Sequence, residues 1–210
     1  MGASFKDKKW LVTIDNFYKK VSGISSPGQA FQNQLEAVKI DGDYTVLGSE
    51  VLVQRNFGRF YSWLSYSFNH NEYRFDSYNP PQFPNNFEIR HSISWAGIYD
   101  WHKLKLALGS KCYTGRPATT PTGISNLQLL YNEPNSSHLG DFVQFNFSAS
   151  YFWNLNAKTK LQLNASVLNL FNKKNMINRY YRVNAANNTI ESAETYSLER
   201  TPNLSMRVSF

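Results

Sequence analysis

The stretch that decides the fold is FVQFNFSASYF, residues 142–152. Its odd-numbered positions from 143 to 151 are apolar or aromatic, and its even-numbered positions from 144 to 150 are Gln, Asn or Ser. Successive side chains of a β-strand point to opposite faces of the sheet, so this pattern predicts a strand with one apolar and one polar face. A soluble strand averages about 5–6 residues, whereas a strand that crosses a bilayer at a tilt needs roughly 9–11.

The same alternation recurs in seven further segments of the chain. Each segment has an apolar side and a polar side, and most are as long as the first. We therefore predict an all-β fold in which about eight long strands form an antiparallel sheet. The seven further segments are 9–21, 48–57, 60–69, 87–99, 103–114, 160–171 and 203–210.

The composition limits the class of protein. The chain has 210 residues, a formal net charge of +7 and 41% hydrophobic residues, which is too apolar for a disordered chain. Its single cysteine excludes a disulfide scaffold, and no apolar run approaches the ~20 residues of a membrane-spanning helix.

The lysine pairs are scattered and no nucleic-acid motif is present, so we expect no nucleic-acid partner. The N-terminal residues lack the apolar core of a signal peptide, which fits a cytoplasmic protein, a mature chain or a fragment.

The connections between the segments alternate between short and long. Barrels of the bacterial outer membrane have short periplasmic turns and long extracellular loops, whereas a soluble sandwich has no reason to sort its loops in this way. We therefore predict a transmembrane β-barrel segment in the outer membrane, with its apolar face against lipid. The short connections are 58–59, 100–102 and 153–159, and the long ones are 22–47, 70–86, 115–141 and 172–202.

Aromatic residues mark both ends of the predicted strands, as in the two aromatic girdles of membrane barrels. Charge is almost absent from the apolar faces. Arg55 is the exception, and it lies beside a short turn from which its guanidinium can reach the membrane surface. The aromatics at the short-turn end are Trp10, Phe57, Phe60, Trp101, Trp153 and Phe210, and those at the loop end are Tyr18, Phe68, Phe87, Tyr113 and Phe171.

Short motifs along nearly the whole chain have a familiar order and spacing. They are Phe83-Pro84-Asn85-Asn86, Arg90-His91-Ser92, Thr114-Gly115-Arg116-Pro117, Asn135-Ser136, Ser148-Ala149-Ser150-Tyr151, Val167-Leu168-Asn169-Leu170-Phe171-Asn172, Asn178-Arg179-Tyr180-Tyr181, and Thr201-Pro202-Asn203 before the final Phe210. With these motifs the chain resembles the carboxy-terminal part of a TonB-dependent outer-membrane receptor, of the kind common in Bacteroidota.

This resemblance implies a 22-stranded barrel with an amino-terminal plug. Such a receptor imports a scarce nutrient, such as an iron–siderophore complex, cobalamin or a glycan, and is driven through TonB. At roughly 26 residues per strand and loop, residues 1–210 would supply about eight of the 22 strands. We therefore expect the C-terminal part of the barrel, without signal peptide or plug, so that TonB is a partner only through the missing plug. Gln144 and Asn146 stand where the family carries Arg and Asp, which removes an expected ion pair.

The long connections carry the candidate contacts to a small nutrient ligand. Extracellular loops touch ligand in the family, and aromatic and arginine side chains suit sugars, catechols and anionic chelates. The candidate ligand-binding residues are Arg116, Tyr131, Arg179, Tyr180 and Tyr181.

The last segment has one unbroken apolar face and ends on an aromatic residue. In outer-membrane proteins such a strand resembles the signal that the barrel-assembly machinery recognises, because a strand edge can add to another sheet. The candidate signal residues are Leu204, Met206, Val208 and Phe210.

Two other interpretations remain open at this point. An independent eight-stranded outer-membrane barrel would have almost no lumen and an adhesive or structural role. A soluble carbohydrate-binding β-sandwich shares the alternation. We find no nucleophile elbow and no catalytic Ser/His/Asp arrangement, so we expect no enzyme. The four histidines are spread along the chain, and we expect no metal site and no cofactor.

Overall fold

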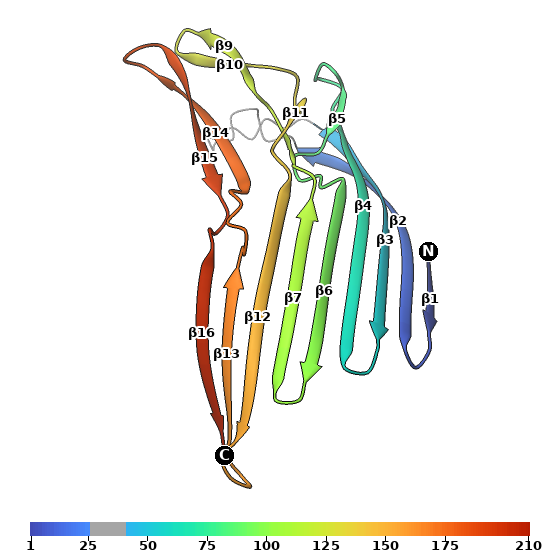
Figure 1. The fold of residues 1–210 in the computed structure, drawn as a ribbon. Helices are drawn as coiled ribbons and strands as arrows, with labels where there is room; N and C mark the ends of the chain where they lie inside the picture. Colours follow the sequence, from blue (N-terminus) through green and yellow to red (C-terminus); the bar gives the residue numbers. More distant parts are fainter. Residues whose placement is uncertain (26–40) are drawn as a thin grey trace.

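One large antiparallel sheet dominates the computed structural model, which describes residues 1–25 and 41–210 (Figure 1). Nine of its strands are neighbours in the order in which they are given below, and β5 (Gln82–Pro84) pairs with β4. Within the described part, no helix has the length and hydropathy to cross a membrane. The nine strands are β1 (Gly2–Lys6), β2 (Trp10–Ser25), β3 (Asp41–Asn56), β4 (Phe60–Arg74), β6 (His91–Trp101), β7 (Leu104–Tyr113), β12 (Phe142–Asn154), β13 (Lys160–Leu168) and β16 (Thr201–Ser209).

All eight segments predicted from the alternation are strands of this sheet. Strand β1 is not predicted, because its five residues are too few to show a period of two. The segment 87–99 becomes a strand only at His91, because the Asn85 side chain accepts a hydrogen bond from Phe87 N at 2.8 Å and closes a turn there. The segment 160–171 stops at Leu168, because Asn169 has a positive φ of 50° and leaves the ladder.

The long connections contain strand pairing of their own, which the alternation does not predict. Strands β2 and β3 continue into the connection 22–47, whose residues 26–40 lie outside the described residues. Two further connections fold into small two-stranded ladders at the end of the sheet opposite the short turns (Figure 1). The ladders are β8 (Pro117–Ala118) with β11 (Ser137–His138), β9 (Pro121–Ser125) with β10 (Gln128–Tyr131), and β14 (Met176–Asn184) with β15 (Thr189–Tyr196).

The pairing register puts the apolar side chains on one face of the whole sheet. Directly paired residues of antiparallel strands lie side by side on the same face. One row of paired residues crosses seven strands and is apolar throughout, and a row on the other face is polar. The apolar row is Ala3, Ile14, Val51, Tyr66, Ile93, Cys112 and Val143, and the polar row is Asp100, Lys105, Ser150, Asn164 and Ser205.

The apolar face is not covered by a second layer. Leu64 is 42% exposed and Leu204 81%, although both belong to the predicted apolar side. Among the described residues, the buried apolar side chains are Phe75, Phe83, Leu139 and Phe142, all near the loop end. A β-sandwich buries its apolar faces between two sheets, so the single layer contradicts the sandwich interpretation. A continuous exposed apolar face marks a membrane or protein contact.

The exceptional charge on the apolar face is shielded by aromatic rings. The Arg55 guanidinium lies 4.3 Å from the Trp10 ring centroid and 3.8 Å from that of Phe57, next to the short turn.

The assignment of one aromatic residue, Tyr113, to the girdle at the loop end is wrong. Tyr113 pairs with Ser92 on the polar face and stacks on Phe142 with 4.5 Å between ring centroids, because it is one position out of register with the apolar residues of β7.

The exposed apolar face predicts the behaviour of the chain in solution. Expressed without a membrane, residues 1–210 should aggregate, and they should regain β-structure only in detergent or lipid, since nothing in the sheet buries that face from water. Circular dichroism together with size-exclusion chromatography measures this. A monodisperse β-rich monomer in plain buffer would contradict the membrane assignment.

Candidate ligand-binding site

A cluster of aromatic rings holds the first folded connection onto the sheet. Phe75 is 3% exposed and Phe83 7% exposed, and their ring centroids lie 6.1 Å apart. The Tyr73 and Tyr78 rings pack against both. Gly42 makes this packing possible, because a Cβ there would lie 2.1 Å from the Phe75 ring. The segment between β4 and β5 is therefore anchored by its own side chains.

Buried amides hold the connection between β13 and β16. Asn169 and Asn175 are each 1% exposed. The Asn175 side chain accepts a hydrogen bond from Val143 N at 2.9 Å and donates one to Val143 O at 3.0 Å, as a neighbouring strand would. Asn169 Nδ2 donates to the carbonyls of Lys173 at 2.9 Å and Leu198 at 3.1 Å. These two side chains fix the base of the β14–β15 hairpin on β12.

Gln144 and Asn146 connect to the same structure. Gln144 Nε2 donates to Asn146 Oδ1 at 2.8 Å, and that oxygen also accepts a hydrogen bond from Asn169 N at 3.0 Å. A neutral amide pair therefore takes the place of the Arg–Asp pair that the family pattern led us to expect.

Arg116, the first candidate ligand residue, joins two connections. Its Nη2 donates a hydrogen bond of 2.5 Å to the carbonyl oxygen of Ile177, which lies 61 residues later in β14. Its own carbonyl accepts a hydrogen bond from Leu139 N at 2.9 Å. No carboxylate within the described part of the chain forms an ion pair with Arg116. Its guanidinium charge therefore lacks a neutralising partner there.

Three of the other candidates, Arg179, Tyr180 and Tyr181, lie on the two faces of the β14–β15 hairpin. Arg179 and Tyr181 are two positions apart in β14 and share a face, on which Arg179 Nη2 lies 3.1 Å from Glu194 Oε1. Tyr131 at the end of β10 belongs with this face: partial burial, and then the nearby Tyr181, raise the pKa of the Tyr131 phenol. Tyr180 points to the opposite face, where it is 54% exposed and accepts a hydrogen bond from Asn178. The structure thus groups Tyr131, Arg179 and Tyr181 and separates Tyr180.

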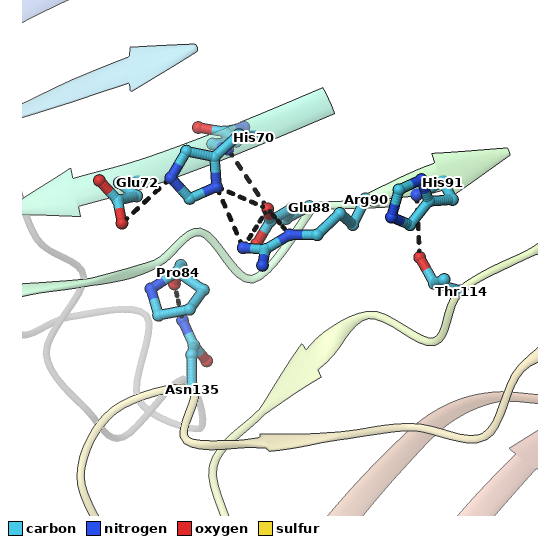
Figure 2. A network of polar contacts seen from close by, with 9 residues as sticks. His70, Glu72, Pro84, Glu88, Arg90, His91, Thr114 and Asn135 are labelled. Atoms are coloured by element: carbon cyan, nitrogen blue, oxygen red, sulfur yellow. Dashed lines mark hydrogen bonds and ion pairs between the residues drawn. The ribbon is translucent and has the colours of Figure 1, made fainter. Parts of the chain in front are cut away.

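A second polar cluster, which sequence analysis did not predict, lies at the loop end of β4 and β6. Figure 2 shows His70 between Glu72 and Glu88, with the Arg90 guanidinium beside them. Glu88 is 2% exposed and thus the most deeply buried carboxylate of the described residues. Glu88 and Arg90 stand two positions apart in the sequence, but no spacing signal joins them to His70.

The candidate assembly residues lie on the free edge strand β16. Leu204, Met206, Val208 and Phe210 are 81%, 68%, 39% and 95% exposed. Strand β16 pairs with β13 on one side, and in the described residues no strand pairs with its other side. Backbone N–H and C=O groups along that edge are therefore open to another strand.

Solved structures of other proteins share this fold. The ferric citrate transporter FecA in its unliganded form superposes with a TM-score of 0.72 at 15% identity, over 99% of this chain and 30% of that one. This chain therefore has the fold of a part of that transporter. FpvA of P. aeruginosa, in an iron–pyoverdine complex, superposes with a TM-score of 0.67 at 13% identity, over 99% of this chain and 26% of that one. This chain therefore spans less than a third of either. No family model and no curated protein matches it.

The buried amide of Asn175 predicts a measurable loss of stability. Asn175→Ala should lower the free energy of unfolding in detergent by roughly 1–3 kcal/mol, because both backbone groups of Val143 lose their partners in a buried place. Denaturant unfolding followed by tryptophan fluorescence gives this value. Asn187→Ala is the control, since its exposed side chain only accepts a hydrogen bond from Thr189, and it should change the value by less than about 0.5 kcal/mol. Equal losses from both variants would contradict the anchoring role.

Proposed function

We propose that residues 1–210 form the C-terminal part of the barrel of a TonB-dependent receptor in the bacterial outer membrane, which binds and imports a scarce nutrient. The observation that carries this proposal is the register of the sheet, with one face apolar across seven strands and the other polar. Lipid would cover the first face and the second would line the lumen. Contact with TonB is assigned to a plug domain, and not to the strands described here.

The open sheet favours a part of a larger barrel over an independent one. Within the described residues β1 pairs only with β2 and β16 only with β13, and no ladder joins β1 to β16. A barrel removes its edges by closing, and an open edge in lipid leaves backbone groups unpaired. This observation disfavours the alternative of an eight-stranded barrel that closes on itself.

The nutrient is proposed to be of the siderophore, cobalamin or glycan type. One structural neighbour is named a ferric citrate transporter and the other holds an iron complex of a pyoverdine, so iron chelates are the first class to test. Neither neighbour is described as an enzyme.

Ligand contact is assigned to the surface formed by Tyr131, Arg179 and Tyr181, and to Arg116, whose charge has no carboxylate partner in the described residues. The likeness to Bacteroidota receptors stays a prediction.

Uptake measurements test this function. Deletion of the encoding gene should abolish growth on one scarce source among ferric citrate, a ferric pyoverdine, cobalamin and an oligosaccharide, and the unaltered gene should restore it. Tyr181→Ala should then raise the half-saturating concentration for uptake about tenfold, since a buried aromatic contact is worth a kcal/mol or more.

Tyr180→Ala is the matched control, because this neighbouring side chain points to the other face. It should leave half-saturation within about twofold of wild type. Unchanged growth of the deletion strain on all four sources would contradict the import function. Equal effects of the two tyrosine substitutions would contradict the assignment of the face.

We further propose that β16 is the strand that the barrel-assembly machinery recognises. Its free edge and its exposed apolar side chains support this, because strand addition needs unpaired backbone groups and alternate side chains give specificity.

Deletion of Phe210 tests this role on the intact protein in cells. The deletion should reduce the amount inserted in the outer membrane severalfold and leave chains in the periplasm for proteases, as measured by fractionation and immunoblotting. Trp101→Ala is the control, since Trp101 is another exposed aromatic at the short-turn end of the apolar face. Equal and mild losses would show that Phe210 is only one girdle aromatic among several.

A further inference from the structure

The excess positive charge of the chain lies at the short-turn end of the sheet (Figure 1). Each short turn, between β1 and β2, β3 and β4, β6 and β7, and β12 and β13, carries an exposed lysine or arginine. These turn cations are Lys8 and Lys9, Arg59, Lys103 and Lys158. In the long connections, by contrast, carboxylates outnumber lysines and arginines. This separation of charge favours an anionic partner at the short-turn end.

The carboxylates at the short-turn end leave the turn cations without ion pairs. Asp7 Oδ1 accepts hydrogen bonds from Lys9 N and Trp10 N, each of 2.6 Å, and so it serves to close the β1–β2 turn. Asp100 Oδ1 lies 3.3 Å from Lys105 Nζ, on the strand paired with its own. Within the described ranges, no ion pair involves a turn cation. Their charges therefore add up at this surface.

Arg55 places one more cation on the apolar face at the same end. It pairs with Trp10 of β2 and Ser62 of β4, and its guanidinium lies over the Trp10 and Phe57 rings. Its Nε has no hydrogen-bond partner, and no carboxylate of residues 1–25 and 41–210 pairs with it. Stacking uses the flat face of a guanidinium and leaves donors on its edge, which suit the oxygens of a phosphate. The rings therefore hold the charge without neutralising it.

Both neighbouring turns are fixed close to the strand end that carries Arg55. Lys9 O accepts a hydrogen bond from Asn56 N at 2.9 Å, which ties the β1–β2 turn to β3. Asn56 Oδ1 accepts one from Gly58 N at 2.9 Å, and the positive φ of 81° at Gly58 lets the β3–β4 turn reverse tightly. Arg59 follows in this turn and is exposed. Turn cations therefore flank β3 on both sides of Arg55.

A phospholipid surface would present phosphates at this level. Aromatic side chains gather at the membrane–water interface, so Trp10 and Phe57 mark the depth at which headgroups lie. A basic residue at that depth strengthens the binding of anionic lipid by roughly fivefold. We propose that the short-turn end binds a phospholipid with an anionic headgroup, whose phosphate Arg55 holds between the β1–β2 and β3–β4 turns. This inference rests on the membrane location proposed above and goes beyond the import function.

Native mass spectrometry of the intact protein in detergent tests this site, with phosphatidylglycerol and phosphatidylcholine of identical acyl chains as probes. The unaltered protein should bind phosphatidylglycerol at least tenfold more tightly, because phosphatidylcholine carries no net charge. Arg55→Gln should weaken the binding of phosphatidylglycerol about fivefold and Arg59→Gln about threefold. Phosphatidylcholine binding should stay within about twofold in both variants. The Arg59→Gln change lies in an exposed turn, so its effect does not depend on packing around Arg55.

Arg200→Gln is the matched control, since it removes the same charge from an exposed arginine at the loop end. This variant should bind both lipids within about twofold of the unaltered protein. Equal losses in Arg55→Gln and Arg200→Gln would overturn the proposal, as would equal binding of the two lipids by the unaltered protein. Displacement of the lipid by an equal concentration of free glycerol 3-phosphate would indicate a site for dissolved phosphates and would overturn the lipid assignment.

Insertion into vesicles separates this proposal from the membrane location on which it rests. The intact protein should insert into vesicles of either lipid, as measured by flotation and circular dichroism. Insertion into both, with no preference for phosphatidylglycerol in mass spectrometry, would overturn the lipid site alone. A protein that inserts into neither would contradict the membrane location and the lipid site together.

Discussion

The fold depends on the need to pair every backbone N–H and C=O where no water is present. Each long strand of the sheet follows its neighbour over most of its length, and in the bilayer proposed for this sheet the backbone groups could bond only to neighbouring strands. The side chains obey the same constraint, since a slip of one residue would turn Val51 and Tyr66 to the polar face of the sheet and their polar neighbours to the apolar face. Arg55 shows how a charge near the short turns is accommodated on the apolar face, since the Trp10 and Phe57 rings cover its guanidinium.

This constraint explains which parts of the fold could be predicted from the sequence. Strands with one apolar and one polar face repeat the alternation for eight residues or more, and all eight such segments are strands. Strand ends could not be predicted, because single side chains set them: Asn85 closes the turn before His91, and Asn169 turns the chain after Leu168. The small ladders were also missed, since the amide of Asn175 reaches Val143 across 32 residues with no periodic signal.

For the candidate site, residue types were easier to predict than neighbours. Arginines and tyrosines of the long connections pointed to a binding surface, but the bond of Arg116 to Ile177 spans 61 residues and depends on how two connections fold. The separation of Tyr180 from Tyr181 was present in the sequence, because adjacent strand residues face opposite ways. The cluster of His70, Glu88 and Arg90 was not, since it forms only where β4 passes the turn before β6.

The unequal length of the strands has a mechanical consequence for the end of the sheet that carries the long connections. Strands β2 and β3 have 16 residues each and β13 has nine, so at about 3.3 Å per residue they reach roughly 50 Å and 30 Å. The β2–β3 side is a ladder of backbone hydrogen bonds with one shift of register, between Ser22 and Ile24, and it resists bending. The β13 side ends at Asn169 and carries the β14–β15 hairpin on a few side-chain amides. A force on this end of the sheet is therefore expected to tilt the β14–β15 hairpin relative to the sheet and to leave β2 and β3 in place.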